Sequence, residues 1–139
     1  MDDAALDFLR AAIETPSPSG YEEPIQALVG DYVRPHADEM RTDVHGNLIA
    51  AVGDVSGPRL MYAGHCDQIG MLVSHIDEQG FLYAQTIGGW DPQQLVGQAM
   101  TVWTDGGPVP AVISRKPIHL LSTEERKKVV RLEELWLDI

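Results

Sequence analysis

The sequence predicts an α/β fold in two parts, a helical beginning that leads into a short buried strand, followed by an antiparallel β unit. Two observations predict this architecture. Apolar residues recur at helical spacing through the early part of the chain, and strand-like runs that flank turn signals occupy residues 71–114. The change of pattern falls near residues 68–70, so we expect two units, residues 1–68 and 69–139.

The first helix is expected over residues 2–15. Asp2 or Asp3 can cap it, because a carboxylate at a helix N-terminus accepts hydrogen bonds from amide groups that have no partner within the helix. The sequence Thr-Pro-Ser-Pro at residues 15–18 contains two prolines, which end the helix.

A capping-box pattern predicts the start of the second helix. Ser19 and Glu22 have the spacing at which a hydroxyl and a carboxylate each satisfy a free amide group at a helix N-terminus. Apolar side chains then recur at the spacing of one helical face until Pro35 ends the run.

Strand patterns follow the second helix. Runs 41–44 and 48–52 flank a His-Gly-Asn turn and predict a hairpin, and the short apolar run 60–63 predicts a buried strand. We expect the β unit to add two more hairpins, a short basic helix opened by a second capping box, and a last strand, at residues 71–85, 99–114, 122–128 and 135–139.

The composition excludes several classes of function. The 139 residues carry 21 Asp and Glu against 10 Lys and Arg, a formal net charge of -11, which argues against a nucleic-acid partner because phosphates require a cationic surface. Cys66 is the single cysteine, so no intrachain disulfide can form and a reducing compartment is expected. The acidic start is unlike a secretory signal, and the apolar runs are too short to cross a bilayer. We therefore expect a cytoplasmic protein with no membrane partner.

The sharpest candidate site is the sequence His65-Cys66-Asp67, which follows the apolar run 60–63. Alternate residues of a strand share one side of the pleat, and open α/β sheets bind ligands at the ends of their strands. His65 could therefore ligate a metal, with Asp67 holding its other ring nitrogen. The spacing alone favours the alternative, a surface histidine beside a turn aspartate. Cys66 is expected to be a small buried residue rather than a nucleophile, since no paired base is identified.

Two other patterns allow functional interpretations. The Gly-Gly-Trp-Asp-Pro sequence at residues 88–92 is typical of a structured loop or of a subunit contact. Adjacent acidic pairs such as Glu124-Glu125 invite a glycosidase interpretation. Neighbouring residues on a helix or turn do not face each other, however, so a solvated surface is the better interpretation of these pairs.

Taken together, the motifs resemble the N-terminal part of the two-metal aminopeptidases that form large tetrahedral particles, known as glutamyl or deblocking aminopeptidases. The similarity extends from about Leu6 to Ile139. The matching stretches are Ser19–Pro24, Asp43–Leu48, Ala63–Gly70, Ser74–Phe81, Gln85–Pro92 and Lys116–Lys128. So many ordered matches are far more specific than a His-x-Asp motif alone.

The resemblance implies a particular architecture and chemistry. Residues 1–68 would be the first piece of an α/β zinc-peptidase catalytic domain, and residues 69–139 an incomplete, β-rich, PDZ-like dimerisation domain. His65 would be a metal ligand, and Asp67 the catalytic-site aspartate that orients and polarises it. The complete enzyme would use two divalent metal ions, Zn or Co, to remove N-terminal residues from a peptide substrate, and would form homo-oligomers, from dimers to dodecamers.

The departures from the family pattern limit this implication. The remaining metal ligands and the general base would lie beyond residue 139, and one histidine cannot hold two metals. The apolar run 135–139 has no turn or partner strand after it, a second reason to expect a piece of a longer protein. Gln68 stands where the family often has Glu. We expect an inactive portion of a metal-dependent aminopeptidase; the alternatives are a non-catalytic oligomerisation module or truncated pseudo-enzyme and, less favoured, a cellulase (endoglucanase).

Overall fold

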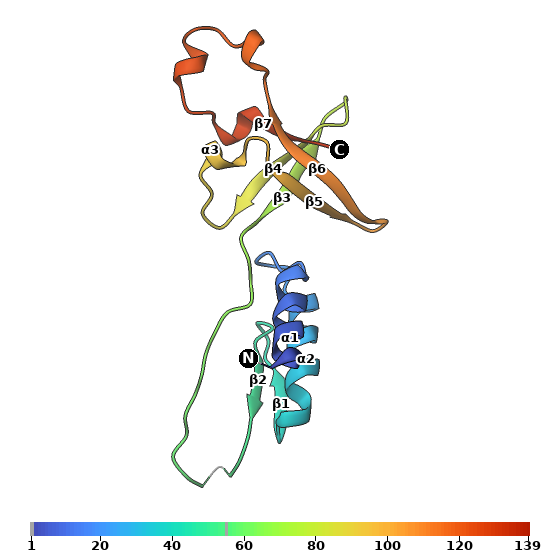
Figure 1. The fold of residues 1–139 in the computed structure, drawn as a ribbon, viewed down its shortest axis with the longest axis vertical. Coiled ribbons are helices and arrows are strands. Elements are labelled where there is room, and N and C mark those ends of the chain that lie inside the picture. Colours follow the sequence, from blue (N-terminus) through green and yellow to red (C-terminus); the bar gives the residue numbers. More distant parts are fainter. Residues whose placement is uncertain (1, 55) are drawn as a thin grey trace. The chain divides into compact units, whose positions relative to one another are not determined.

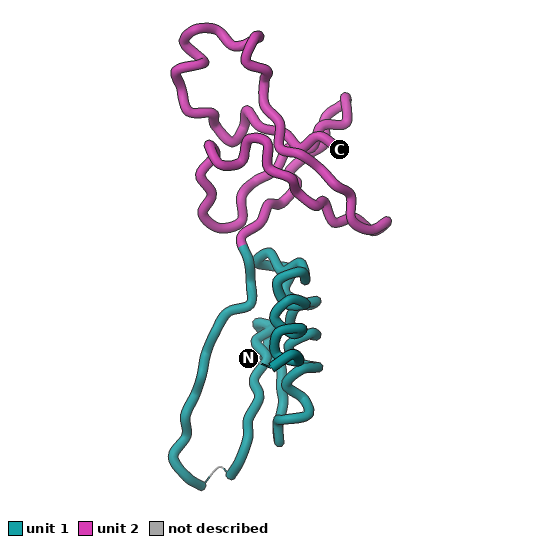
Figure 2. Tube along the Cα trace, in the orientation of Figure 1, with its two compact units in different colours: residues 1–68 teal, residues 69–139 magenta. Residues whose placement is uncertain are grey.

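The computed structural model describes residues 2–54 and 56–139 (Figure 1). The chain divides into two compact units, unit 1 at Met1–Gln68 and unit 2 at Ile69–Ile139 (Figure 2). In the part of the chain that is described, no helix has the length and apolar character needed to cross a membrane.

Two helices form one side of unit 1. Helix α1 (Asp3–Glu14) begins after Asp2, whose carboxylate accepts a hydrogen bond from the Ala5 amide at 2.8 Å, as a cap does. Helix α2 (Glu23–Val33) continues into the single turn η1 (Arg34–His36). The rings of Phe8 and Tyr32 stack with centroids 4.0 Å apart and join the two helices. The prediction of the first helix and of its Asp2 cap is confirmed.

The predicted start of the second helix is wrong. Helix α2 begins four residues after Ser19, and its N-cap residue is Glu22, whose side chain makes no capping hydrogen bond. The Glu22 carboxylate instead accepts the Gly20 amide, at 2.7 Å. Gly20 has a φ of +93°, which a helix cannot continue through. The hydroxyl of Ser19 is therefore available for another partner.

The hairpin predicted between the helices and the site is confirmed. Strands β1 (Glu39–Thr42) and β2 (Leu48–Ala51) pair antiparallel. The Asp43 carboxylate organises the turn by accepting hydrogen bonds from the His45 and Asn47 amides at 2.9 and 3.0 Å. Gly30 of α2 lies against this hairpin, where a Cβ would be in ordinary van der Waals contact with Leu48 and Met40, at 3.6 and 3.8 Å.

The buried strand predicted at residues 60–63 is not observed. Leu60, Met61 and Tyr62 are 78%, 85% and 89% exposed and belong to no strand. A buried strand needs neighbouring strands for its amide and carbonyl groups and a layer over each face. The described residues of unit 1 supply neither, so this apolar run remains extended and open to solvent.

Unit 2 is built on a five-stranded antiparallel sheet with the order β3-β4-β7-β6-β5. Its strands are β3 (Gly70–Ile76), β4 (Leu82–Ile87), β5 (Ala99–Thr104), β6 (Gly107–Arg115) and β7 (Leu135–Asp138). The short helix α3 (Pro92–Leu95) and the single turns η2 (Ile118–Leu120), η3 (Glu125–Lys127) and η4 (Leu132–Glu134) connect them. Both hairpins predicted for this unit are confirmed.

The last predicted strand is present and is paired on both sides. Strand β7 lies in the middle of the sheet, where Leu137 pairs with Leu82 of β4 on one side and with Ile113 of β6 on the other. The partners precede β7 in the chain by a long connection, which the local pattern of residues does not reveal.

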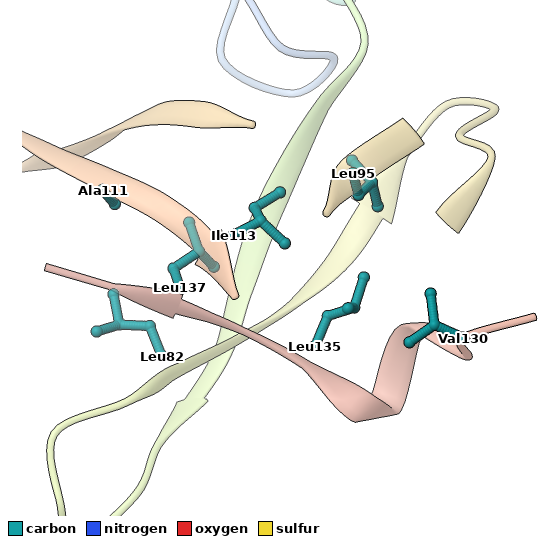
Figure 3. Packing of buried hydrophobic residues seen from close by; sticks show 7 residues of the cluster. All are labelled: Leu82, Leu95, Ala111, Ile113, Val130, Leu135 and Leu137. Atoms are coloured by element: carbon teal, nitrogen blue, oxygen red, sulfur yellow. The ribbon is translucent and has the colours of Figure 1, made fainter. Parts of the chain in front are cut away.

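The core of unit 2 is a single apolar cluster contributed by α3, the strands β4, β6 and β7, and the segment before η4 (Figure 3). Its buried members are Leu82, Leu95, Ala111, Ile113, Val130, Leu135 and Leu137. Leu95 is 0% exposed. The cluster fixes α3 against the sheet and explains why this short helix is stable.

The loop at residues 88–92 has a structural role in unit 2. The Trp90 indole donates a hydrogen bond to the Gly70 carbonyl at 3.0 Å, and its ring packs against the core cluster. Asp91 caps α3 by accepting the Gln93 amide at 2.9 Å. Gly88 has a φ of +81°, and a Cβ there would lie 2.7 Å from Cγ2 of Ile69. These contacts are those of a structured loop, the first of the two interpretations.

The second capping box is present. The Ser122 amide donates to the Glu125 carboxylate at 2.7 Å, and the Glu125 amide donates to the Ser122 hydroxyl at 3.2 Å. The helix that it opens is only the single turn η3, shorter than predicted.

Candidate functional site

The candidate site lies in a cleft within unit 1. The cleft has a volume of about 810 Å³ and is lined by three segments, residues 20–26, 42–47 and 64–67. The first comes from the turn before α2 and the start of that helix, the second from the β1–β2 turn, and the third from the extended segment that carries the His-x-Asp motif. Polar and acidic side chains dominate the lining, with His65 and Asp67 among them.

The structure brings the two predicted site residues together. Nδ1 of His65 lies 2.9 Å from Oδ1 of Asp67. The imidazole is 86% exposed and the carboxylate 37% exposed, so the pair lies at the surface of the unit. A carboxylate oxygen accepts, so Nδ1 carries the proton. In a neutral ring Nε2 then keeps its lone pair, which is the atom that a metal ion would bind.

Asp67 has a second partner that the sequence did not identify. The Ser19 hydroxyl donates to Oδ2 of Asp67 at 2.6 Å, across 48 positions of sequence. The hydrogen bond from Ser19, and then the one from His65, lower the pKa of Asp67 below its ordinary value. The carboxylate therefore remains ionised and is held on both oxygens.

Two other residues that line the cleft, Asp43 and Cys66, have separate roles. Asp43 is engaged in its own turn, where the Asn47 side chain lowers its pKa. Cys66 lines the cleft and is partly buried, and this burial raises the pKa of its thiol. A raised pKa keeps the thiol protonated, which disfavours a nucleophile at this position.

The described residues fit one ligand position of a metal centre. In residues 2–54 and 56–139, no group of three or more His, Cys, Asp or Glu side chains has the arrangement that could hold a metal ion. A catalytic Zn takes about three protein ligands. The donor chemistry of His65, with a carboxylate on its other nitrogen, matches one such ligand.

Comparison with known proteins identifies the family. The model of the M42 glutamyl aminopeptidase family matches residues 46–139. The chain belongs to this family. Lysyl aminopeptidase of Pyrococcus furiosus is 39% identical over 115 residues, which are 82% of this chain and 33% of that protein. Glutamyl aminopeptidase of Lactococcus lactis is 31% identical over 123 residues, which are 84% of this chain and 34% of the relative.

Solved structures of M42-like proteins share the fold. A TET aminopeptidase from a marine sediment archaeon of the Thaumarchaeota has a TM-score of 0.94 and 36% identity. The alignment covers 99% of this chain and 38% of the archaeal chain. The TET1 peptidase of Pyrococcus horikoshii, described as assembling into a tetrahedron or a large octahedral shell, has a TM-score of 0.82 and 33% identity. The alignment covers 96% of this chain and 40% of the Pyrococcus chain. A Thermotoga maritima structure named endoglucanase has a TM-score of 0.75 and 28% identity. The alignment covers 94% of this chain and 37% of the Thermotoga chain.

This chain matches only part of each relative, which limits the properties that can be inferred from the relatives. The chain spans about a third of the length of the two M42 relatives above. The recognition of the family from its motifs is confirmed, and so is the α/β fold. The two relatives are named as a lysyl and a glutamyl aminopeptidase.

Proposed function

We propose that this chain forms the first part of a metal-dependent aminopeptidase that removes N-terminal residues from peptides. One observation carries the proposal, the 2.9 Å contact between His65 and Asp67, which leaves Nε2 of the imidazole for a metal in a chain of the M42 family. His65 would be a metal ligand, and Asp67 would fix its orientation and increase its basicity. Two divalent ions, Zn or Co, would polarise the peptide carbonyl and activate water when bound.

The 139 residues alone are proposed to be catalytically inactive. One imidazole does not complete the coordination that a catalytic Zn requires, and no set of three donors is found in the described residues. Weak metal binding at His65 without peptide hydrolysis is the expected behaviour. A cellulase role is the less favoured alternative, and Asp67 does not suit it: both of its oxygens accept hydrogen bonds, whereas a glycosidase needs a carboxyl free to transfer a proton or attack.

Unit 2 is proposed to be a PDZ-like dimerisation domain. Its sheet has two outer strands, β3 and β5, and Leu72 and Ile76 of β3 are each 62% exposed. Exposed apolar side chains on an outer strand favour association with another strand or sheet. The assemblies named for the Pyrococcus horikoshii relative support a homo-oligomer here. The alternative is a non-catalytic oligomerisation module.

A cytoplasmic location fits the single cysteine, and the net charge of -11 disfavours a nucleic-acid partner.

Cobalt titration tests the metal site. Paramagnetic Co²⁺ added to the 15N-labelled protein should broaden signals of residues 64–67 first, because broadening falls steeply with distance from the ion. His65→Ala should abolish this pattern. His36→Ala is the matched control, since His36 lies in η1 and does not line the cleft. Broadening that is unchanged in His65→Ala would contradict the proposal.

An activity assay separates the enzyme from the module. The purified chain, with Zn²⁺ or Co²⁺ added, should not release the chromophore from aminoacyl p-nitroanilides. Strong hydrolysis that His65→Ala removes would show that the chain is a complete catalyst and would overturn the proposed inactivity. Absence of metal binding at His65, together with a stable dimer, would favour the oligomerisation module.

A further inference from the structure

We propose that Ser19 is a positioning residue of this site, which holds the Asp67 carboxylate so that its other oxygen keeps His65 in the Nδ1-protonated form. The Ser19–Asp67–His65 arrangement is observed in the structure. Only its consequence for a metal rests on the proposed function above.

The contact between Ser19 and Asp67 has the geometry of a strong hydrogen bond. At 2.6 Å it falls in the short range typical of a hydroxyl that donates to an ionised carboxylate. The terminal torsion of an aspartate side chain is otherwise soft, with broad two-fold minima. Asp67 is partly exposed, so a second hydrogen bond restricts a carboxylate that water would otherwise compete to solvate.

The backbone places Ser19 beside Asp67 independently of the side chains. Pro18 forms a parallel bridge with Gln68, the residue after Asp67, and the Gln68 amide donates to the Ser17 carbonyl at 2.7 Å. The Tyr21 amide donates to the Pro18 carbonyl at 2.8 Å and closes the turn that follows. Prolines at residues 16 and 18 fix φ, and a proline also keeps the residue before it extended. The segment before α2 therefore forms a rigid support for the site.

A capping role does not account for the Ser19 hydroxyl. The N-cap residue of α2 is Glu22, and the free Gly20 amide is satisfied by the Glu22 carboxylate. Asp67 is the hydrogen-bond partner that the structure gives this hydroxyl. Its position in a turn thus serves the Asp67–His65 pair rather than the helix.

The inference is tested by the tautomer of His65 in the metal-free protein. The 15N shifts of the imidazole distinguish Nδ1-protonated from Nε2-protonated rings. They would be recorded at about pH 8.5, above the usual range of histidine titration. Wild-type protein should be mainly Nδ1-protonated at His65, and Ser19→Ala should move the population toward the Nε2-protonated form. Ser56→Ala is the matched control, because Ser56 donates to Asp54 at 2.9 Å in a loop outside the cleft.

A second pair of variants guards against loss of folding. Threonine and valine have nearly the same shape, and only threonine has a hydroxyl. Ser19→Thr should therefore retain the wild-type tautomer and Ser19→Val should not. Equal tautomer populations in the Thr and Val variants, or no change in Ser19→Ala, would overturn the inference. A structural role without positioning would not produce rescue by threonine.

Cobalt affinity provides the functional measurement. Loss of a group that contacts a metal-binding histidine directly weakens metal binding about 10- to 100-fold, so loss of Ser19, one contact further away, should weaken it about 3- to 10-fold. If the tautomer responds to Ser19 and wild-type His65 binds no Co²⁺, the inference stands and the proposed function fails. If His65 binds Co²⁺ and its tautomer ignores Ser19, the proposed function stands and the inference fails.

Discussion

Replacing Leu95 by alanine tests whether one short helix and the sheet of unit 2 share a single core. Leu95 is 0% exposed and belongs to the buried cluster between α3 and the sheet (Figure 3). The truncation removes about three methylene equivalents, or roughly 2.4 kcal/mol of transfer free energy at about 0.8 kcal/mol each. The cavity that remains raises the expected loss to about 3 kcal/mol, within the range of about 2–5 for such changes.

That loss is large for a unit of this size. A domain of roughly 70 residues has an unfolding free energy of about 4–10 kcal/mol. The melting temperature should fall by roughly 12–24 °C, at about 4–8 °C for each kcal/mol. Urea denaturation followed by tryptophan fluorescence measures the loss. It reports on unit 2 specifically, because the three tryptophans, Trp90, Trp103 and Trp136, all lie there.

Leu120→Ala is the matched control for this prediction. Leu120 is 59% exposed, so the same truncation should change the unfolding free energy by less than about 1 kcal/mol. Both variants should be compared at one protein concentration, because association of the chain would add to stability. A Leu95→Ala loss no larger than that of Leu120→Ala would refute the assignment of α3 to the core.

Three further predictions concern a turn, a titrating group and a helix cap. Gly88→Ala should destabilise unit 2 by about 1–3 kcal/mol in the same urea assay, because of its positive φ and close contact, whereas Gly89→Ala, with open space around its Cβ, should not. Hydrogen bonds from Ser122, and the Lys116 ammonium, lower the pKa of Glu125 from 4.5 to about 2; the folded value lies below the unfolded one, so this stabilisation is present above about pH 4.5 and is lost as pH falls through about 2. Glu125→Gln should flatten the measured slope of stability over that interval, and an unchanged slope would exclude this group as the cause. Asp2→Ala should weaken α1 by about 1 kcal/mol, measured as faster amide exchange in its first turn, with no change expected in α2.

Hairpins and one helix were predictable because their signals are local. The Asp43 turn, the Asp2 cap and the capping box at Ser122 all depend on residues within a few positions of one another. The motif His65-Cys66-Asp67 belongs to the same class, since two residues at spacing two can meet without help from the rest of the chain. The family followed from the ordered motifs, and the match over residues 46–139 confirms it.

The features that were not predicted correctly share a different cause, because each depends on contacts between residues far apart in the sequence. Ser19 and Glu22 have the spacing of a capping box. No neighbouring residue indicates that the Ser19 hydroxyl instead donates a hydrogen bond to Asp67, 48 positions away. The run 60–63 is apolar enough for a buried strand, but burial requires neighbours that no local pattern supplies. The place of strand β7 in the middle of the sheet was not predicted, because its partners, β4 and β6, lie far back in the sequence.

Local chemistry therefore decided the turns, the caps and the family motifs, since these depend on backbone preferences and contacts within one turn of chain. The tertiary structure alone decided which hydroxyl holds Asp67, which strand lies in the centre of the sheet and which apolar run stays exposed. Each of these depends on bringing distant segments together. Pairing distant segments depends on the free energy of the whole fold, so a short stretch of sequence does not reveal it.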